Sequence, residues 1–202
     1  MMTDLKTHLY KYIPEHSVDY CHQLWLEHNF RFVIKKKRKT KLGDYRYDPK
    51  LKRHSISVNN DLNPYSFLIT YLHEVAHLIA FKKYGRKAAP HGQEWKNAFK
   101  MIMLPVLNDK VFPEDVLRKA ASYLKNPKAS SCNDHALTKV LSKYDKKQDG
   151  VILEELPLGQ SFTLGSRKFK KDVLRRTRFL CEEIESGKKY LVSKSALVQI
   201  IE

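Results

Sequence analysis

Two histidines and one glutamate occur within five consecutive residues, His73-Glu74-Val75-Ala76-His77. Residues four apart lie on the same face of a helix, so the imidazoles of His73 and His77 can both reach one metal ion. Glu74 is rotated by one residue, which lets its carboxylate face a water on that metal and exchange a proton with it. A catalytic zinc site normally has three protein ligands, so this pattern requires a third.

His91 is the candidate third ligand. It lies 14 positions after His77, at the start of His91-Gly92-Gln93-Glu94-Trp95. We expect Gly92 to allow a sharp turn that brings the imidazole back towards the first two. Glu94 is the alternative, because some zinc proteases take a glutamate from the following helix. The glycine turn favours His91.

The segment that carries the first motif is predicted to be a buried helix. Asn63 can cap its first turn, Pro64 suits the first helical position, and Gly85 ends it. Between these residues the sequence is apolar almost all round, which is typical of a helix inside a core. Buried polar groups without partners cost on the order of 1–3 kcal/mol each, and one metal ion would satisfy the histidines and the glutamate together.

The elements around this helix predict an α+β domain. Residues 3–28 are expected to be helical with a break at Pro14, and further helices are expected over 93–103 and 113–124. We expect an antiparallel β meander packed on these helices, with the lysine-rich connection at one hairpin tip. Its three strands are predicted from the alternating stretches 30–34, 45–47 and 56–58.

The composition changes near residues 126–134. We therefore expect a first domain over 1–125, a linker with a short helix over 126–145, and a small basic β-hairpin module over 146–202. Short strands are predicted in this C-terminal β module at 161–164, 168–169, 178–184 and 189–193, the last two joined as a hairpin.

The net charge is +16, from 38 Lys and Arg against 22 Asp and Glu, and it is concentrated. Residues 31–54 carry a net +9 and residues 167–178 a net +6. Clustered positive charge attracts a polyanion by releasing its counterions, whereas the alternative is a basic surface that only keeps the protein soluble. We expect salt-sensitive binding of DNA without sequence specificity. The candidate contacts are Lys35, Lys36, Lys37, Arg38, Lys39, Lys41, Arg167, Lys168, Lys170, Lys171, Arg175 and Arg176.

Three aromatic residues of the C-terminal module, Phe169, Phe179 and Tyr190, allow two interpretations. Aromatic side chains on an exposed strand face can stack on bases. A module of about 50 residues also needs its own small core, and the core interpretation is the favoured one.

The two histidine motifs together resemble those of a known family. His73-Glu-Val-Ala-His77 and His91-Gly-x-Glu-Trp95, preceded by Lys41-Leu-Gly43 and Ile56-Ser-Val58-Asn-Asn-Asp-Leu, are similar to the SprT-like (Spartan-related) zinc metalloproteases. The resemblance covers roughly residues 15–105, about half of the chain. The His-Glu-x-x-His part alone is shared by most zincins, so the specificity lies in the combination.

This resemblance implies a small zincin-like domain in which His73, His77 and His91 hold one Zn²⁺ and Glu74 is the catalytic acid and base. It also implies a peptidase that cleaves proteins bound or crosslinked to DNA, with activity promoted by DNA, which we expect to be single-stranded or damaged. Many bacterial members carry a C-terminal zinc ribbon built from cysteine pairs. Here Cys181 stands alone, so a second zinc is not expected.

Other classes of protein are disfavoured by what the sequence lacks. Its three cysteines, Cys21, Cys132 and Cys181, form no CxxC pair, which excludes a disulfide framework and a cysteine-rich zinc module. No apolar stretch approaches the roughly 18–20 residues of a membrane helix, and no secretory signal is recognisable. We expect a monomeric, cytoplasmic, nucleoid-associated protein without membrane contact.

The leading hypothesis is a zinc-dependent peptidase whose protein substrate lies extended beside an edge strand, the 55–59 strand or its neighbour. One alternative is a non-catalytic nucleic-acid-binding adaptor in which a zinc closed off by four protein ligands is structural. Another is a metal hydrolase that acts on something other than protein.

Overall fold

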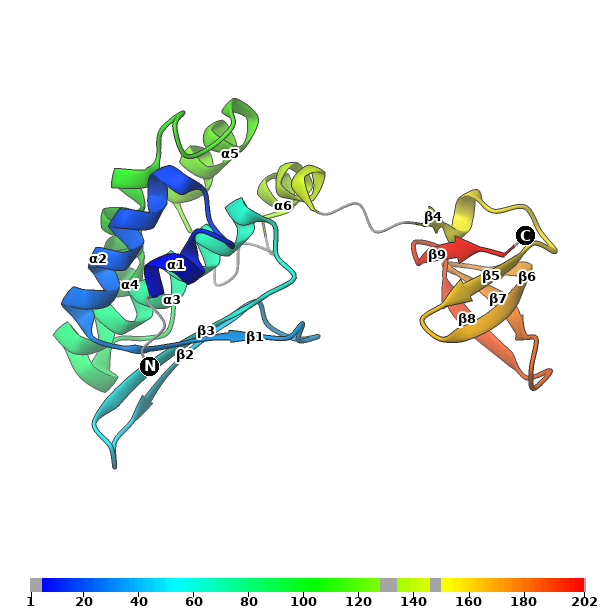
Figure 1. Cartoon of the computed structure of the whole chain (residues 1–202), viewed down its shortest axis with the longest axis horizontal. Coiled ribbons are helices and arrows are strands. Elements are labelled where there is room, and N and C mark those ends of the chain that lie inside the picture. The colour runs from blue at the N-terminus through cyan, green and yellow to red at the C-terminus, as the bar shows by residue number, and fades with distance from the viewer. Residues whose placement is uncertain (1–4, 128–133, 146–149, 202) are drawn as a thin grey trace. The chain divides into compact units, whose positions relative to one another are not determined.

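The computed structural model describes residues 5–127, 134–145 and 150–201. The chain divides into two compact units, Met1–Asp145 and Lys146–Glu202, each with its own helices or strands (Figure 1). None of the helices in the described ranges combines the length and the hydropathy that a membrane span requires.

Helix α3 (Pro64–Tyr84) is the central element of the first unit. The side chain of Asn63 accepts hydrogen bonds from the backbone N–H groups of Tyr65 and Ser66, at 3.1 and 2.9 Å, and so caps the first turn. Gly85 ends the helix with a φ of 61°, a conformation that glycine adopts without strain. The predicted helix and both of its ends are confirmed.

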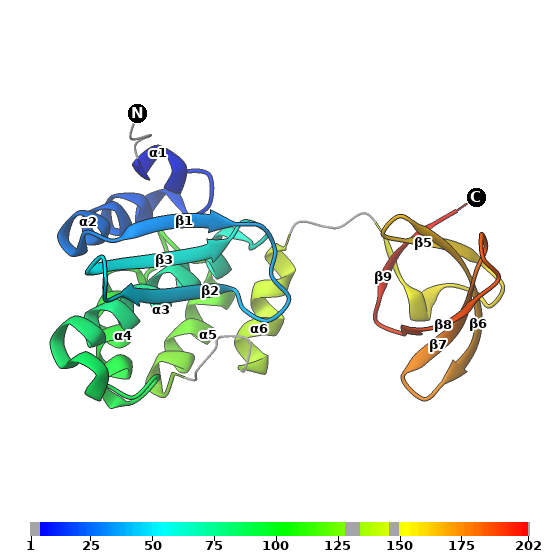
Figure 2. The same cartoon turned by 90° about the horizontal axis from the view of Figure 1, so that it is seen from below.

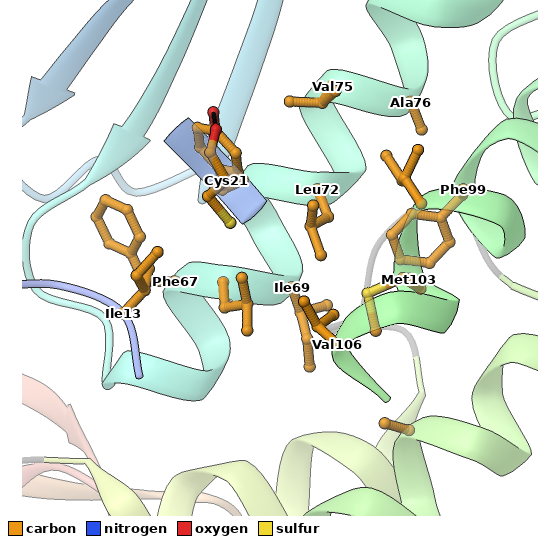
Figure 3. Packing of buried hydrophobic residues seen from close by; sticks show 14 of the residues in the cluster. Ile13, Cys21, Phe67, Ile69, Leu72, Val75, Ala76, Phe99, Met103 and Val106 are labelled. Atoms are coloured by element: carbon orange, nitrogen blue, oxygen red, sulfur yellow. Dashed lines mark hydrogen bonds between the residues drawn. The ribbon is translucent and has the colours of Figure 1, made fainter. Parts of the chain in front are cut away.

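Among the described residues, five further α-helices belong to the first unit. Helix α4 matches the predicted 93–103 helix, and α1 and α2 are separated at Pro14 as predicted. Figure 3 shows apolar side chains of α3, among them Phe67, Leu72 and Val75, in one core with Phe99 of α4. The helices are α1 (Leu5–Leu9), α2 (Val18–His28), α4 (Gln93–Met103), α5 (Glu114–Lys125) and α6 (His135–Leu141). Short 3₁₀ turns of the first unit are η1 (Glu15–Ser17), η2 (Gly85–Lys87), η3 (Leu104–Val106) and η5 (Ser142–Tyr144), and η6 (Leu153–Glu155) lies in the second unit.

Helix α6 lies in the stretch that was expected to be a linker. Its apolar residues Leu137, Val140 and Leu141 are buried in the same core as α3, and the side chain of Asn63 donates to the Leu141 carbonyl at 2.9 Å. Residues 134–145 therefore belong to the first unit. The rest of that expected linker, including Cys132, lies outside the described residues at 128–133.

The sheet of the first unit has three strands, β1 (Arg31–Lys35), β2 (Gly43–Asp48) and β3 (Arg53–Asn59), in the order β1-β3-β2 (Figure 2). Strands β2 and β3 form an antiparallel hairpin, but β1 pairs parallel to β3. The predicted antiparallel meander is therefore wrong. Strand β3 takes the centre because its Ile56 and Val58 are fully buried, and the basic connection 36–42 crosses over the end of β3 instead of forming a hairpin tip.

The second unit is a six-stranded sheet with the strand order β4-β9-β5-β6-β7-β8. Strands β7 and β8 form the predicted hairpin through residues 184–188. The side chains of Phe162, Phe169, Phe179 and Val198 fill a separate small core. The strands are β4 (Val151–Ile152), β5 (Ser161–Leu164), β6 (Arg167–Arg175), β7 (Arg178–Glu183), β8 (Lys189–Ser193) and β9 (Leu197–Ile200).

Candidate metal centre

His73, His77 and His91 meet in one cluster. Their Nε2 atoms are 3.2 Å apart between His73 and His77, 3.1 Å between His73 and His91, and 3.0 Å between His77 and His91. Three nitrogens at these separations can all lie about 2.0–2.1 Å from a single ion, the usual zinc–imidazole distance. The donor set therefore fits a metal ion, and no rearrangement of the chain is needed to form it.

His91 reaches the other two histidines by a turn that differs from the predicted one. The residue with the unusual backbone is His91 itself, with a φ of 60°, whereas Gly92 has an ordinary φ of −69°. Space at Gly92 is tight, because a Cβ on it would lie 3.0 Å from the carbonyl oxygen of Ala89. Glu94, the alternative third ligand, is not in the cluster of metal-competent groups.

Aromatic rings surround the three imidazoles. The Trp95 ring lies 4.6 Å from the His73 ring and 4.8 Å from the His91 ring, centroid to centroid, and its Nε1 donates to the His73 carbonyl at 3.3 Å. On the other side the Tyr45 ring is nearly parallel to that of His77, at 6.4 Å. Packing between these rings limits the rotation of the imidazoles, which is what a preformed metal site requires.

The electrostatics of the cluster favour neutral imidazoles. Burial lowers the pKa of His73 to about 3 and that of His77 to about 4, and the neighbouring histidines act in the same direction. Burial also lowers the pKa of His91. At neutral pH all three rings are therefore unprotonated, which is the form that binds a metal.

Glu74 is buried beside this cluster, with only 7% of its surface exposed. Burial raises its pKa to about 8, and the carboxylate of Asp44 adds to the effect, while Arg38 and a backbone hydrogen bond from Tyr45 oppose it. A dication held by the adjacent histidines would favour the charged carboxylate and lower this pKa again. Glu74 can thus both accept and return a proton near neutral pH.

Gly43 at the start of β2 allows the strand to approach this carboxyl group. A Cβ on Gly43 would lie 2.5 Å from Oε1 of Glu74 and 2.7 Å from Cγ2 of Thr70, so no other residue fits without displacing a neighbour. An open cleft with a volume of about 610 Å³ lies over the site. Residues 40–45, helix α3 and the segment 85–91 line it.

The structure divides the predicted nucleic-acid contacts of the first unit. Lys35, Lys36, Lys37 and Lys39 are exposed, and the ammonium of Lys37 lies 3.6 Å from the carboxylate of Asp61. Lys41 is half-buried and donates to Asp44 at 2.6 Å. Arg38 is half-buried against β3, where its guanidinium hydrogen-bonds to the protein itself.

In the second unit Lys168, Lys170, Arg175 and Arg176 are exposed. Lys171 is not available for DNA: it is 3% exposed, donates to the carbonyls of Glu154 and Leu156, and lies 3.8 Å from the centre of the Phe179 ring. The sequence signal for this burial is the spacing: Lys171 follows the core residue Phe169 by two positions, and a strand places both side chains on one face.

Arg167 is exposed, but its guanidinium contacts residues of its own unit. It donates to the carboxylate of Glu183 and stacks over the Tyr190 ring at 4.3 Å. Phe169 and Phe179 are 3% and 5% exposed, so the interpretation as a small core is confirmed for these two rings. Cys181 is buried in the same core.

Three residues of the site escaped sequence reasoning in the roles that the structure shows: Tyr45 beside His77, Trp95 beside the histidines, and Arg38 at the end of β3. Trp95 lies four residues after His91, in the first turn of α4, which is a usable signal. For Tyr45 and Arg38 the signal depends on the strand order, which the sequence does not reveal.

Comparison with known protein families matches residues 10–115, just over half of the chain, to the SprT-like family. The match contains all three histidines, Glu74, Gly43 and Tyr45. No solved structure matches the chain.

Proposed function

The chain belongs to the SprT-like family, which is associated with metalloprotease activity, and from this we propose that it is a zinc-dependent peptidase of the zincin type. One observation carries the proposal: three neutral imidazoles converge within 3.0–3.2 Å on an open cleft, next to a buried carboxyl group. Three histidines with space for a water and a substrate are a donor set that zinc enzymes use.

His73, His77 and His91 would hold the zinc, which when bound supplies Lewis-acid activation of a water and of the substrate carbonyl. Glu74 accepts a proton from the attacking water and delivers it to the leaving amine nitrogen, so that the peptide bond is hydrolysed without net change in the enzyme. The backbone N–H of Tyr45 holds the Glu74 carboxylate in place for both transfers.

The substrate would lie extended beside β2. Strand β3 is paired on both sides, whereas β2 is an edge strand and its first residues line the cleft. Of the two strands considered from the sequence, the neighbour of the 55–59 strand therefore suits the role. A peptide can add to such an edge through backbone hydrogen bonds, which recognise any sequence.

DNA association is part of the same proposal. Its support is charge: four exposed lysines lie in 35–39, and exposed basic side chains follow β6 and the turn after it. Contacts of this kind bind phosphate without reading sequence. Proteins bound to single-stranded or damaged DNA would then be the substrates, in the cytoplasm and at the nucleoid.

The test compares wild type with Glu74→Gln and with Glu94→Gln as the matched control. Substrates are a protein crosslinked to single-stranded DNA and the same protein free, and zinc is measured by elemental analysis. We expect about one zinc per chain in all three proteins, cleavage by wild type and Glu94→Gln, and a loss of at least 10²-fold in Glu74→Gln. Full cleavage by Glu74→Gln would refute the proton-transfer role of Glu74. A wild type that binds zinc but cleaves neither substrate would favour the adaptor, and one that holds no zinc after refolding with the metal would refute the zinc peptidase and favour a basic binding module without a metal.

A further inference from the structure

Arg38 differs from the other cations of the basic crossover, residues 36–42. Its neighbours Lys37 and Lys39 are exposed, but Arg38 is half-buried and turned onto the end of β3. Its Nε donates to Oδ1 of Asn59 at 2.7 Å, its Nη1 to the Ser57 hydroxyl at 3.1 Å, and its Nη2 contacts the Leu42 carbonyl at 3.4 Å. Three of the five N–H donors of the guanidinium are thus used within the protein, which leaves two for any other partner.

Asn59 is the first partner in this arrangement. It is fully buried, and its Nδ2 donates to the Lys41 carbonyl at 2.9 Å while its backbone N–H donates to the Leu42 carbonyl, also at 2.9 Å. Because a guanidinium has only donors, it fixes the amide with Oδ1 towards Arg38 and Nδ2 towards Lys41. Arg38 thereby orients the Asn59 amide so that its Nδ2 group donates to the crossover.

The crossover leads directly to the proposed proton-transfer group. Gly43 follows Leu42, and its backbone is so close to Glu74 that an added Cβ would lie 2.5 Å from Oε1. Two residues later the Tyr45 backbone hydrogen-bonds to the Glu74 carboxylate. A shift of the Lys41–Leu42 carbonyls therefore moves the two backbone segments that confine this carboxylate.

We propose that Arg38 is a positioning residue for Glu74, which acts through Asn59 and the Lys41–Gly43 backbone, and that it is not a contact for nucleic acid. The inference rests on the proposed function, in which Glu74 moves the proton. The inference distinguishes Arg38 from the lysines on both sides of it. Those lysines are exposed to solvent, whereas Arg38 forms hydrogen bonds that position one wall of the cleft.

The experiment compares Arg38→Met with Lys39→Met, which removes one positive charge from the next position of the same crossover. Peptide cleavage is measured without DNA, and affinity for single-stranded DNA by fluorescence anisotropy. We expect Arg38→Met to lower kcat at least 10-fold with KM and zinc content unchanged, since misplacement of a reacting group by about 1 Å can cost about 10²-fold. Lys50→Met, an exposed lysine outside the predicted nucleic-acid contacts, should keep its kcat. Lys39→Met should weaken DNA binding, and Arg38→Met should weaken it less than Lys39→Met does.

Two further variants separate hydrogen bonding from charge and guard against misfolding. Arg38→Lys keeps the charge but loses the planar set of donors, and it should recover less than half of the lost kcat. Full recovery would overturn the route through Asn59. Ser57→Ala removes one acceptor of Arg38 and should lower kcat in the same direction but less.

Hydrogen exchange of the whole chain supplies a readout that does not need activity. In Arg38→Met the amides of residues 41–45 should exchange at least 10-fold faster than in wild type, with α3 unchanged, whereas in Lys39→Met they should not. A wild type without peptidase activity would refute the proposed function, but hydrogen exchange would still test whether Arg38 orders the Lys41–Gly43 backbone through Asn59. Unchanged exchange at 41–45 together with unchanged kcat would overturn the inference.

Discussion

The tight approach of Gly43 to Glu74 predicts the effect of one added methyl group. In Gly43→Ala the new Cβ would lie 2.5 Å from Oε1 and 2.8 Å from Cγ of Glu74, and 2.7 Å from Cγ2 of Thr70. Carbon atoms pack at about 3.5–4.0 Å, so these contacts must open by roughly 1 Å. Thr70 is β-branched and fixed on α3, which leaves the longer side chain of Glu74 as the group that moves.

The displacement is large for a group that transfers protons. A misplacement of about 1 Å can cost about 10²-fold in rate, so we expect kcat of Gly43→Ala to fall by about 10- to 100-fold. Overpacking of this kind costs roughly 1–3 kcal/mol of stability. The histidines do not contact Gly43 in this way, and zinc content should stay at the wild-type level.

The assay is steady-state peptide cleavage with zinc measured in the same samples. Gly187→Ala is the control: a Cβ there meets no atom within 4 Å, and its φ of 66° strains only a turn of the second unit, so the substitution should cost some stability but leave kcat unchanged. Adding Thr70→Ser to Gly43→Ala removes Cγ2 but keeps the hydroxyl that donates to the Ser66 carbonyl at 2.7 Å, and it should restore part of the rate. A Gly43→Ala enzyme with full zinc and a kcat within twofold of wild type would refute the claim that Gly43 sets the position of Glu74.

Three other predictions concern the metal and the second unit. Co²⁺ added to the zinc-free chain should quench the fluorescence of Trp95, whose ring lies 4.6 Å from that of His73, and Trp95→Phe should abolish the quenching; a full response from the other tryptophan would contradict the site. Lys171→Ala should destabilise the second unit by about 1–3 kcal/mol, because it removes the donor to the buried Leu156 carbonyl and to the partly buried Glu154 carbonyl. The exposed Lys170→Ala should change stability little. Hydrogen exchange of β5–β8 distinguishes the two variants, and equal effects would count against the role of these bonds. The hydrogen bond from Arg167 lowers the pKa of Glu183 to about 2, so its contribution to stability is complete above about pH 4.3 and is lost as the pH falls through 2; an NMR titration midpoint above 4 would disprove this.

The helices were predictable because their signals are local. Asn63, Pro64 and Gly85 mark the ends of α3 within the sequence itself, and the apolar residues between them require burial wherever the helix packs. The third histidine could be predicted for a similar reason: it stands one short loop beyond the helix, just before α4.

The strand order was not predictable in this way. Alternation in 30–34 shows that a strand has one buried face, but it does not show which strand is its neighbour or in which direction it runs. The parallel pairing of β1 with β3 places the basic crossover over the end of β3, and this alone brings Arg38 to Asn59. Arg38 and Lys171 were predicted to contact DNA because they lie in basic segments. A sequence shows which residues are charged, but it does not show which one of several neighbouring cations is buried.

Strand β2 is an edge strand of the sheet in the described residues, and such an edge is also a template on which copies of a chain can aggregate. Charged side chains occupy every second position along it, Asp44, Arg46 and Asp48, and Asp44 is held in ion pairs of 2.6 Å with both Lys41 and Arg46. A second copy that paired with this edge would have to remove water from those charges. A single extended peptide carries few charges of its own, so its pairing costs less. We therefore expect these charges to disfavour aggregation through this edge, and apolar substitutions at the three positions to promote it.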